Sequence, residues 1–581
     1  MRRSGVWVVA VLALVAAVPA ARAVTPVPPP RLTEERAVAI LLEEDGVRAW
    51  VARYPRESLV TEAEYDEEYR DWTVKAWSGD AGQIVLGRVD DLTGLVEDAW
   101  TGPQVAWPMA RGTEGAFGGK RLNSLPVWLG FCAVFILGLA DLRRLRSLRN
   151  LDLLVLVSLS VSLWFFNEGR IFTSVPLVYP VLLYLLARTL WIGLRARPSV
   201  ASRPVWPIWL LVAATIFLAG FRIGLDVGDS NVIDVGYSGV IGAHRIASGQ
   251  APYGHFPLEE GEECGPADRN GRVVLRIQEN GRCEGQNAHG DTYGPVTYQA
   301  YLPGYAFFGW KGKGDPLHAA HFTAIVFDLA CVLGLVLVGL RYGDRRLAAT
   351  LAFAWTAYPF TQYVASSSSN DAIQPALLIF GFWLASSPWG RGSLAALASW
   401  TKFAPLVVAP LWATYPERRF RPTVLFLAAF AAATLAAFWV LLLEPDPLGS
   451  VRTVWDRTIG SQLGRESPFS LWDWRQYHAG LPDLYLVQRA LQVLLVVGAL
   501  ALAFVPRRKS PLQLAALTAA LLIGFEIALT HWFYLYLAWF FPFVAFAILA
   551  PERDEGGAEA ALDLRWEGDA STSSSRSAPH T

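Results

Sequence analysis

The stretch "WPIWLLVAATIFLAGFRIGLDVGDSNVIDVGYSG", residues 206–239, decides the fold class of this chain. Residues 206–225 are almost uncharged and have the length of a helix that crosses a hydrocarbon core of about 30 Å. Asp229 and Asp234 are among the carboxylates that the chain carries just beyond the apolar run. We therefore expect a membrane protein with acidic groups where this span reaches water.

The overall composition indicates the same class. Hydrophobic residues make up 53% of the 581 residues and charged residues only 17%, whereas a soluble domain has about a quarter charged. A net charge of −1 argues against nucleic acid as a partner, because nucleic acid requires a basic surface. The sequence contains no CxxC pair, HExxH helix, P-loop or dinucleotide fingerprint. It predicts no cofactor and leaves a divalent cation open.

Thirteen apolar stretches are predicted to span the membrane: 125–142, 151–167, 172–194, 206–225, 319–340, 347–364, 372–387, 391–402, 403–415, 423–444, 484–505, 511–530 and 532–550. Basic loops such as "RRLRSLRN" and "VPRRK" are expected on the cytoplasmic side. That orientation requires the chain to turn back near Lys402. Non-helical backbone at this depth is tolerated inside protein or beside water, so the break indicates a site.

The predicted fold is an all-α polytopic membrane protein with a small α+β extracytoplasmic domain. Residues 1–23 are predicted to be a signal peptide, with a retained first span as the alternative. The other predicted regions are 24–124 (extracytoplasmic domain), 125–205 (three accessory helices), 206–550 (membrane core with outer loops 226–318 and 445–483) and 551–581 (disordered cytoplasmic tail). A helix is expected within 33–55, strands at 71–79 and 83–91, and a hairpin turn in 90–100. This pattern resembles a PepSY-like domain, which we interpret as a spacer or interaction module.

The four cysteines divide into two pairs. Cys132 and Cys331 lie in apolar spans, where a thiol behaves as a small hydrophobic group. Cys264 and Cys283 share one hydrophilic loop that would be exported, so a structural disulfide is predicted between them.

Polar motifs gather at the predicted outer face, in the order "DVGY" (234–237), "SGQAPYG" (248–254), "YGPVTYQAYLPGY" (293–305), "SSSNDAIQPALLIFGFWLA" (367–385), "WTKFAP" (400–405), "RTIGSQLGRESPFSLWDW" (457–474) and "THWFY" (530–534). This order resembles polyprenyl-phosphate-sugar-dependent glycosyltransferases of the GT-C fold, and most closely the mannosyltransferase-like glycosyltransferase family 87. The resemblance covers roughly residues 206–550.

The resemblance implies roles for Asp234 and Lys402, and their position at the predicted outer face makes other polar residues candidates as well. Asp234 takes the place of the general base, with Asp229 as the alternative base or as a modulator of its pKa. Donor phosphate is expected at Lys402, His531 and Arg465, and substrate at Tyr237, Tyr253, Tyr293, Asn370 and Asp371. The alternatives are a snorkelling Lys402, an aromatic anchor at His531, a solvated Arg465 and an N-cap at 370–371. For the intramembrane carboxylates Asp328 and Glu526, the alternatives are pairing with a cation such as Arg222 or Lys402, and a proton relay.

The function implied is inverting transfer of a sugar, mannose or similar, from a polyprenyl-phosphate donor. The acceptor hydroxyl would belong to a glycolipid, a polysaccharide or a protein on the outer face of a bacterial plasma membrane. A transporter or a flippase of lipid-linked oligosaccharide is the alternative. That class would favour charges spread through the membrane depth and internal repeats, and the sequence contains no such repeat.

Overall fold

The computed structural model describes residues 29–67, 69–112, 115–195, 206–230, 232–254, 276–277, 283–284, 290–311, 317–463, 465–478 and 481–550. The chain divides into two compact units, residues 1–106 and 107–581. The predicted signal peptide 1–23 and the predicted tail 551–581 lie outside the described residues.

The N-terminal unit is a small α+β domain. Its helices are α2 (Glu34–Glu43), α3 (Asp45–Val51) and α4 (Pro103–Ala106), with short turns η1 (Arg56–Ser58) and η2 (Gly79–Ala81). An antiparallel sheet in the order β1-β2-β3-β4 is formed by Leu59–Asp66, Asp71–Ser78, Gln83–Asp90 and Val96–Thr101. The predicted helical region is confirmed as two consecutive helices, α2 and α3, and both predicted strands and the hairpin turn are confirmed. Strands β1 and β4 were not predicted as strands.

One face of this sheet is covered by α2, which contacts all four strands. Leu41 of α2 and Val85 of β3 are fully buried between them. A Cβ atom at Gly87 of β3 would lie 2.4 Å from Cδ1 of Leu41. Glycine at this position therefore lets the helix approach the strand closely.

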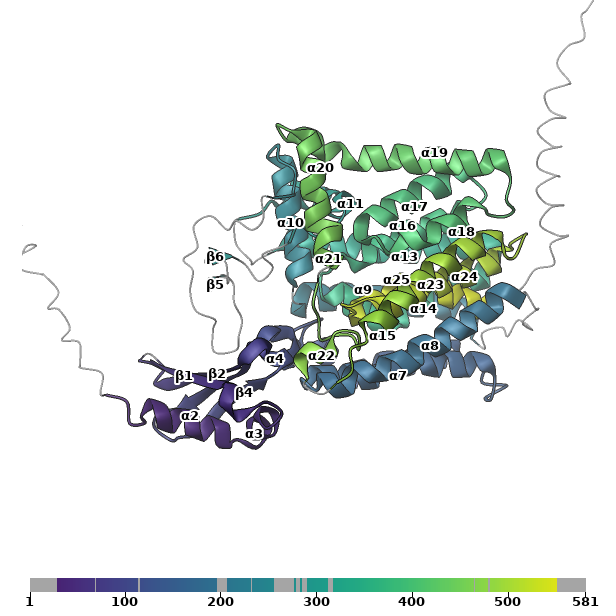
Figure 1. Cartoon of the computed structure of the whole chain (residues 1–581). Coiled ribbons are helices and arrows are strands. Elements are labelled where there is room, and N and C mark those ends of the chain that lie inside the picture. Colours follow the sequence, from purple (N-terminus) through teal and green to yellow (C-terminus); the bar gives the residue numbers. More distant parts are fainter. Residues whose placement is uncertain are drawn as a thin grey trace, which may run out of the picture. The chain divides into compact units, whose positions relative to one another are not determined.

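The second unit is helical (Figure 1). Its first half contains η3 (Pro108–Arg111), α5 (Lys120–Asn123), α6 (Leu125–Leu139), α7 (Leu148–Asn167), α8 (Ile171–Arg195), α9 (Ile208–Asp229), α10 (Asp234–Ala247), α11 (Pro295–Ala300), α12 (Leu302–Phe308), α13 (His318–Tyr342), α14 (Arg345–Ala357) and α15 (Pro359–Ser366). Residues Arg276–Ile277 and Cys283–Glu284 form the two-residue strands β5 and β6.

The second half contains η4 (Asn370–Ala372), α16 (Ile373–Trp383), α17 (Pro388–Lys402), η5 (Ala404–Val408), α18 (Ala409–Ala413), α19 (Phe420–Ala437), η6 (Phe438–Leu443), α20 (Pro447–Trp455), η7 (Asp456–Gly460), α21 (Ser461–Leu463), α22 (Trp474–Tyr477), α23 (Tyr485–Phe504), α24 (Pro511–Ala528), η8 (Tyr534–Tyr536) and α25 (Leu537–Leu549). A helix therefore lies in each predicted apolar range.

Seven helices of the described part are long and apolar enough to cross a membrane: Leu148–Asn167, Ile171–Arg195, Ile208–Asp229, His318–Tyr342, Phe420–Leu443, Tyr485–Phe504 and Pro511–Ala528. A multi-pass membrane protein is thus supported, while the predicted number of thirteen spans is not confirmed. Helix α24 forms the centre, since 83% of its apolar window is buried against 22% for α23. It packs against α8 and α25 (Figure 1).

A buried ion pair joins two of these spans. The guanidinium of Arg222 on α9, only 1% exposed, pairs with Asp328 on α13. Its Nε donates to Oδ2 of Asp328 at 3.1 Å, and the indole of Trp355 donates to Oδ1 at 2.8 Å. The predicted pairing of Asp328 with Arg222 is confirmed. Glu526 instead accepts a hydrogen bond from the indole of Trp532 at 3.1 Å.

The predicted break near Lys402 is also present. Helix α17 ends at Lys402, and Phe403 has the left-handed φ of 57° before η5 begins. Trp400 already departs from helical geometry, with φ −90° and ψ 19°. The ammonium of Lys402 therefore stands at the end of a helix, where the backbone changes direction.

We predict that Asp328→Ala lowers the free energy of unfolding by about 3–5 kcal/mol, because Arg222 stays buried without its counter-ion. Thermal unfolding of the detergent-purified protein measures this loss. As a control, Glu417→Ala breaks an exposed pair with Arg419 that is worth about 0–1 kcal/mol. The double variant Arg222→Met, Asp328→Leu removes both charges and should regain most of the stability. A double variant as unstable as Asp328→Ala would contradict the assignment.

Candidate functional site

Lys402 lies inside a ring of aromatic side chains and is paired with one carboxylate. Its Nζ is 2.6 Å from Oδ1 of Asp371, and its side chain is only 7% exposed. The same Nζ lies 5.3, 5.4 and 5.5 Å from the ring centroids of Tyr293, Tyr536 and Trp539. The indole of Trp539 also donates to Oδ1 of Asp371 at 3.0 Å. These contacts fix the ammonium, which argues against a lysine that snorkels to the interface.

Polar atoms without partners remain beside this pair. Asp371 is fully buried, and its Oδ2 has no hydrogen-bond partner among the described residues. The amide of Asn370, 1% exposed, likewise bonds to nothing there through either Nδ2 or Oδ1. Ser369, rather than Asn370 or Asp371, caps η4. Buried polar groups of proteins are normally satisfied, so these atoms are free to bond to a polar ligand.

Asp234 begins helix α10 and lies within electrostatic reach of the same group. Burial raises the pKa of the Asp234 carboxyl above its ordinary value of 3.8. The positive charges of Arg465 and Lys402 act against that rise, and the negative charge of Asp371 adds to it. The structure thus brings together the predicted acidic residue and the predicted lysine, from positions 168 residues apart in the sequence.

Arg465 and His531 form the third side of the cluster. Nη2 of Arg465 lies 3.3 Å from Nε2 of His531, whose Nδ1 lies 2.9 Å from the hydroxyl of Ser467. Burial, followed by the charges of Arg465 and Lys402, holds the pKa of His531 well below its ordinary value of 6.5. His531 is therefore neutral at physiological pH, and Arg465 and Lys402 are the cations of the cluster.

A strained loop holds the segment that carries Asp234. Ser368 has the left-handed φ of 45°, which is unfavourable for a residue with a side chain. Its hydroxyl donates to Asp226 at 3.0 Å and lies 3.1 Å from Nδ1 of His321. The backbone N–H of Ile233 donates to the carbonyl of Ser367 at 3.3 Å. The loop 366–369 therefore contacts the start of α10 and leads directly into Asn370 and Asp371.

The remaining predicted site residues lie in other surroundings. Asp229 accepts a hydrogen bond from the backbone N–H of Arg121 at 2.6 Å, at the end of α9. The hydroxyl of Tyr253 donates to the carbonyl of Tyr293 at 2.9 Å, which supports the position of that ring. Tyr237 packs against Trp310, and its buried hydroxyl has no partner among the described residues.

Three features of the site were missed by sequence analysis. Tyr536 and Trp539, three residues apart on one helical turn, complete the surroundings of Lys402. Their spacing was visible, but aromatic residues in an apolar helix are also typical of ordinary packing. The contact of Asp226 and His321 with the loop 366–369 had no local signal, because it joins three distant segments.

Among the described residues no group of three or more histidine, cysteine, aspartate or glutamate side chains is arranged to hold a metal ion. Cys264 lies outside the described residues, and so does the side chain of Cys283. The predicted disulfide therefore stays a prediction.

Part of the chain matches the sequence model of a known protein family. Residues 293–531 match the sequence model of glycosyltransferase family 87. The matched segment begins at Tyr293, ends at His531 and includes Asp371, Lys402 and Arg465; Asp234 precedes it. No curated protein matches the chain. The match supports a membrane-bound glycosyltransferase that binds a sugar donor and an acceptor.

We predict that Gly236→Ala lowers sugar transfer at least tenfold. A Cβ atom there would lie 2.3 Å from the carbonyl oxygen of Ser368, so α10 must shift, and a displacement near 1 Å can cost roughly 100-fold in rate. Gly220→Ala on α9 is the matched control, since its Cβ would meet no heavy atom within 4 Å. Initial transfer rates and thermal unfolding should be measured together. Equal rates for the two variants would argue against a role for this contact.

Proposed function

We propose that the protein is an inverting glycosyltransferase that takes its sugar from a polyprenyl-phosphate donor on the outer face of the membrane. The observation that carries the proposal is the convergence of one carboxylate, Asp234, with two cations, Lys402 and Arg465. The family match supports glycosyl transfer in general. The two cations support a phosphate-linked donor, and the sequence resemblance supports a polyprenyl carrier and a mannose-like sugar.

In this mechanism Asp234 accepts the proton of the acceptor hydroxyl as its oxygen attacks the anomeric carbon. The new glycosidic bond forms while the bond from that carbon to the phosphate oxygen breaks. One displacement inverts the anomeric configuration, since no covalent intermediate forms. The raised pKa of Asp234 suits this role, because a base acts best when its pKa approaches the working pH.

The cations are proposed to receive the charge that the leaving lipid phosphate develops. An ammonium has three N–H donors. One of those of Lys402 donates to Oδ1 of Asp371. The remaining donors and the guanidinium of Arg465 would bond to phosphate oxygens with charge-assisted hydrogen bonds. Neutral His531 would orient Arg465 through their 3.3 Å contact. Asn370, with both amide atoms unpartnered, is proposed to bond to sugar hydroxyls.

We predict that Asp234→Asn abolishes transfer by removing the base while keeping the shape of the side chain. A positioned base contributes roughly 10²–10⁴-fold to the rate, so the transfer rate of Asp234→Asn should be lower than that of the unchanged protein by at least that factor. Asp229→Asn, at the carboxylate bonded to Arg121, is the matched control and should retain most of the activity. Mass spectrometry of the glycosylated product measures both. Full activity of Asp234→Asn, or its loss in Asp229→Asn instead, would exclude Asp234 as the base.

We also predict that Arg465→Gln shifts the acid limb of the rate profile to higher pH. The carboxylate form of Asp234 is present only above its pKa, and Arg465 lowers that pKa. Removing the guanidinium therefore raises the pKa, so the active form is lost at a higher pH during acidification. Transfer rates from pH 4 to 9 at saturating donor test this sign. A shift to lower pH would contradict the electrostatic coupling.

A further inference from the structure

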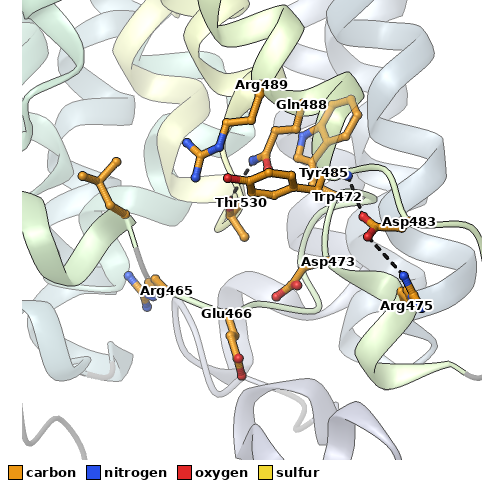
Figure 2. Close-up of a pocket in the computed structure, with 11 residues that line it drawn as sticks. Arg465, Glu466, Trp472, Asp473, Arg475, Asp483, Tyr485, Gln488, Arg489 and Thr530 are labelled. Atoms are coloured by element: carbon orange, nitrogen blue, oxygen red, sulfur yellow. Dashed lines mark hydrogen bonds and ion pairs between the residues drawn. The ribbon is translucent and has the colours of Figure 1, made fainter.

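A separate pocket of about 480 Å³ opens beside this cluster. Its wall is formed by residues within 465–475, by Leu463 and Asp483, by the start of α23 and by Thr530 (Figure 2). Arg465 belongs both to this wall and, through His531, to the cluster around Asp234. The volume lies within the range of about 300–1,000 Å³ that is usual for small-molecule sites.

The charges of the wall are balanced. Three arginines and three carboxylates line the pocket. Arg475 donates to Asp483 at 3.1 Å (Figure 2), and Asp473 accepts the backbone N–H of Ser467 at 2.8 Å. An anion such as phosphate is bound best by cations in excess. A lining with as many carboxylates as arginines instead suits a neutral molecule with many hydroxyl groups, which both donate and accept hydrogen bonds.

Aromatic faces complete this lining. Tyr485 is 51% exposed, and the orientation of Trp472 is fixed because its indole donates to the carbonyl of Ile527 at 2.9 Å. Gln488 is held by two hydrogen bonds from its Nε2, one of them to Thr530 at 2.8 Å (Figure 2). A pyranose ring presents C–H faces that pack on aromatic rings, and hydroxyls that bond to amide, carboxylate and guanidinium groups. Both kinds of surface are present here.

We propose that this pocket binds a saccharide, and that the acceptor of the reaction is a glycan seated there next to the transfer site. This inference rests on the proposed function, and it narrows the acceptor to a molecule that presents a carbohydrate chain, which excludes an unglycosylated protein. Tyr485 and the Arg475–Asp483 pair determine its specificity. Arg465 lines the pocket and also acts electrostatically on Asp234, so a glycan bound there lies next to a residue of the transfer site.

Binding of oligosaccharides tests the pocket directly. The full chain, purified in detergent, is applied to an array of neutral oligosaccharides, with inorganic phosphate as competitor. We expect retention on at least one oligosaccharide, roughly tenfold weaker binding by Tyr485→Ala, and near-normal binding by Tyr485→Phe, which keeps the ring. Trp455→Ala is the matched control, because Trp455 is 54% exposed on the same segment between α19 and α23 but lies outside the pocket.

Three results would overturn the proposal: no retention on any oligosaccharide, equal binding by Tyr485→Ala and the unchanged protein, or displacement by inorganic phosphate. The last would make the pocket an anion site. Steady-state kinetics separate this inference from the proposed function. If Tyr485→Ala transfers sugar from a polyprenyl-phosphate donor with an unchanged acceptor KM, the role of the pocket is contradicted while the transferase function stands. If the protein binds a saccharide but forms no glycosidic product, the transferase function is contradicted while saccharide binding by the pocket stands.

Discussion

The ion pair between Lys402 and Asp371 is the interaction on which the site depends. Two buried charges are costly unless each has a partner with good geometry, and here the ammonium and carboxylate are 2.6 Å apart. The pair ties the end of α17 to η4, and Trp539 of α25 bonds to the same carboxylate oxygen. Three helical segments are therefore held at one point, which fixes the ammonium before any substrate arrives.

The segment 366–371 connects the two chemical halves of the site. At one end it holds the start of α10, through Ser367 and Ser368, and thereby Asp234. At the other end it supplies Asp371 to Lys402. The left-handed backbone of Ser368 is a strained conformation of the kind that persists where surrounding contacts over-determine it. Here those contacts come from Asp226 and His321.

Sequence analysis found what is encoded locally. Apolar runs gave the helices, because length and hydropathy are properties of one segment, and Lys402 stood out because a charge in a span is costly. The pairing of Lys402 with Asp371 and the approach of Arg465 to Asp234 depend on packing between distant helices. No local pattern distinguishes Tyr536 from an ordinary core tyrosine. Residue type and charge do not distinguish Asp229 from Asp234; the family resemblance favours Asp234, and the fold gives the two different surroundings.

The double attachment of the segment 366–371 also constrains how this protein can evolve. Side chains along it can drift if their hydrogen bonds are replaced, but inserting or deleting a single residue would pull one end out of register. The proton acceptor and the cation would then be misplaced in the same event. In an alignment of homologues, this short stretch should show amino-acid substitutions but a constant length, while insertions and deletions accumulate in the loops away from it.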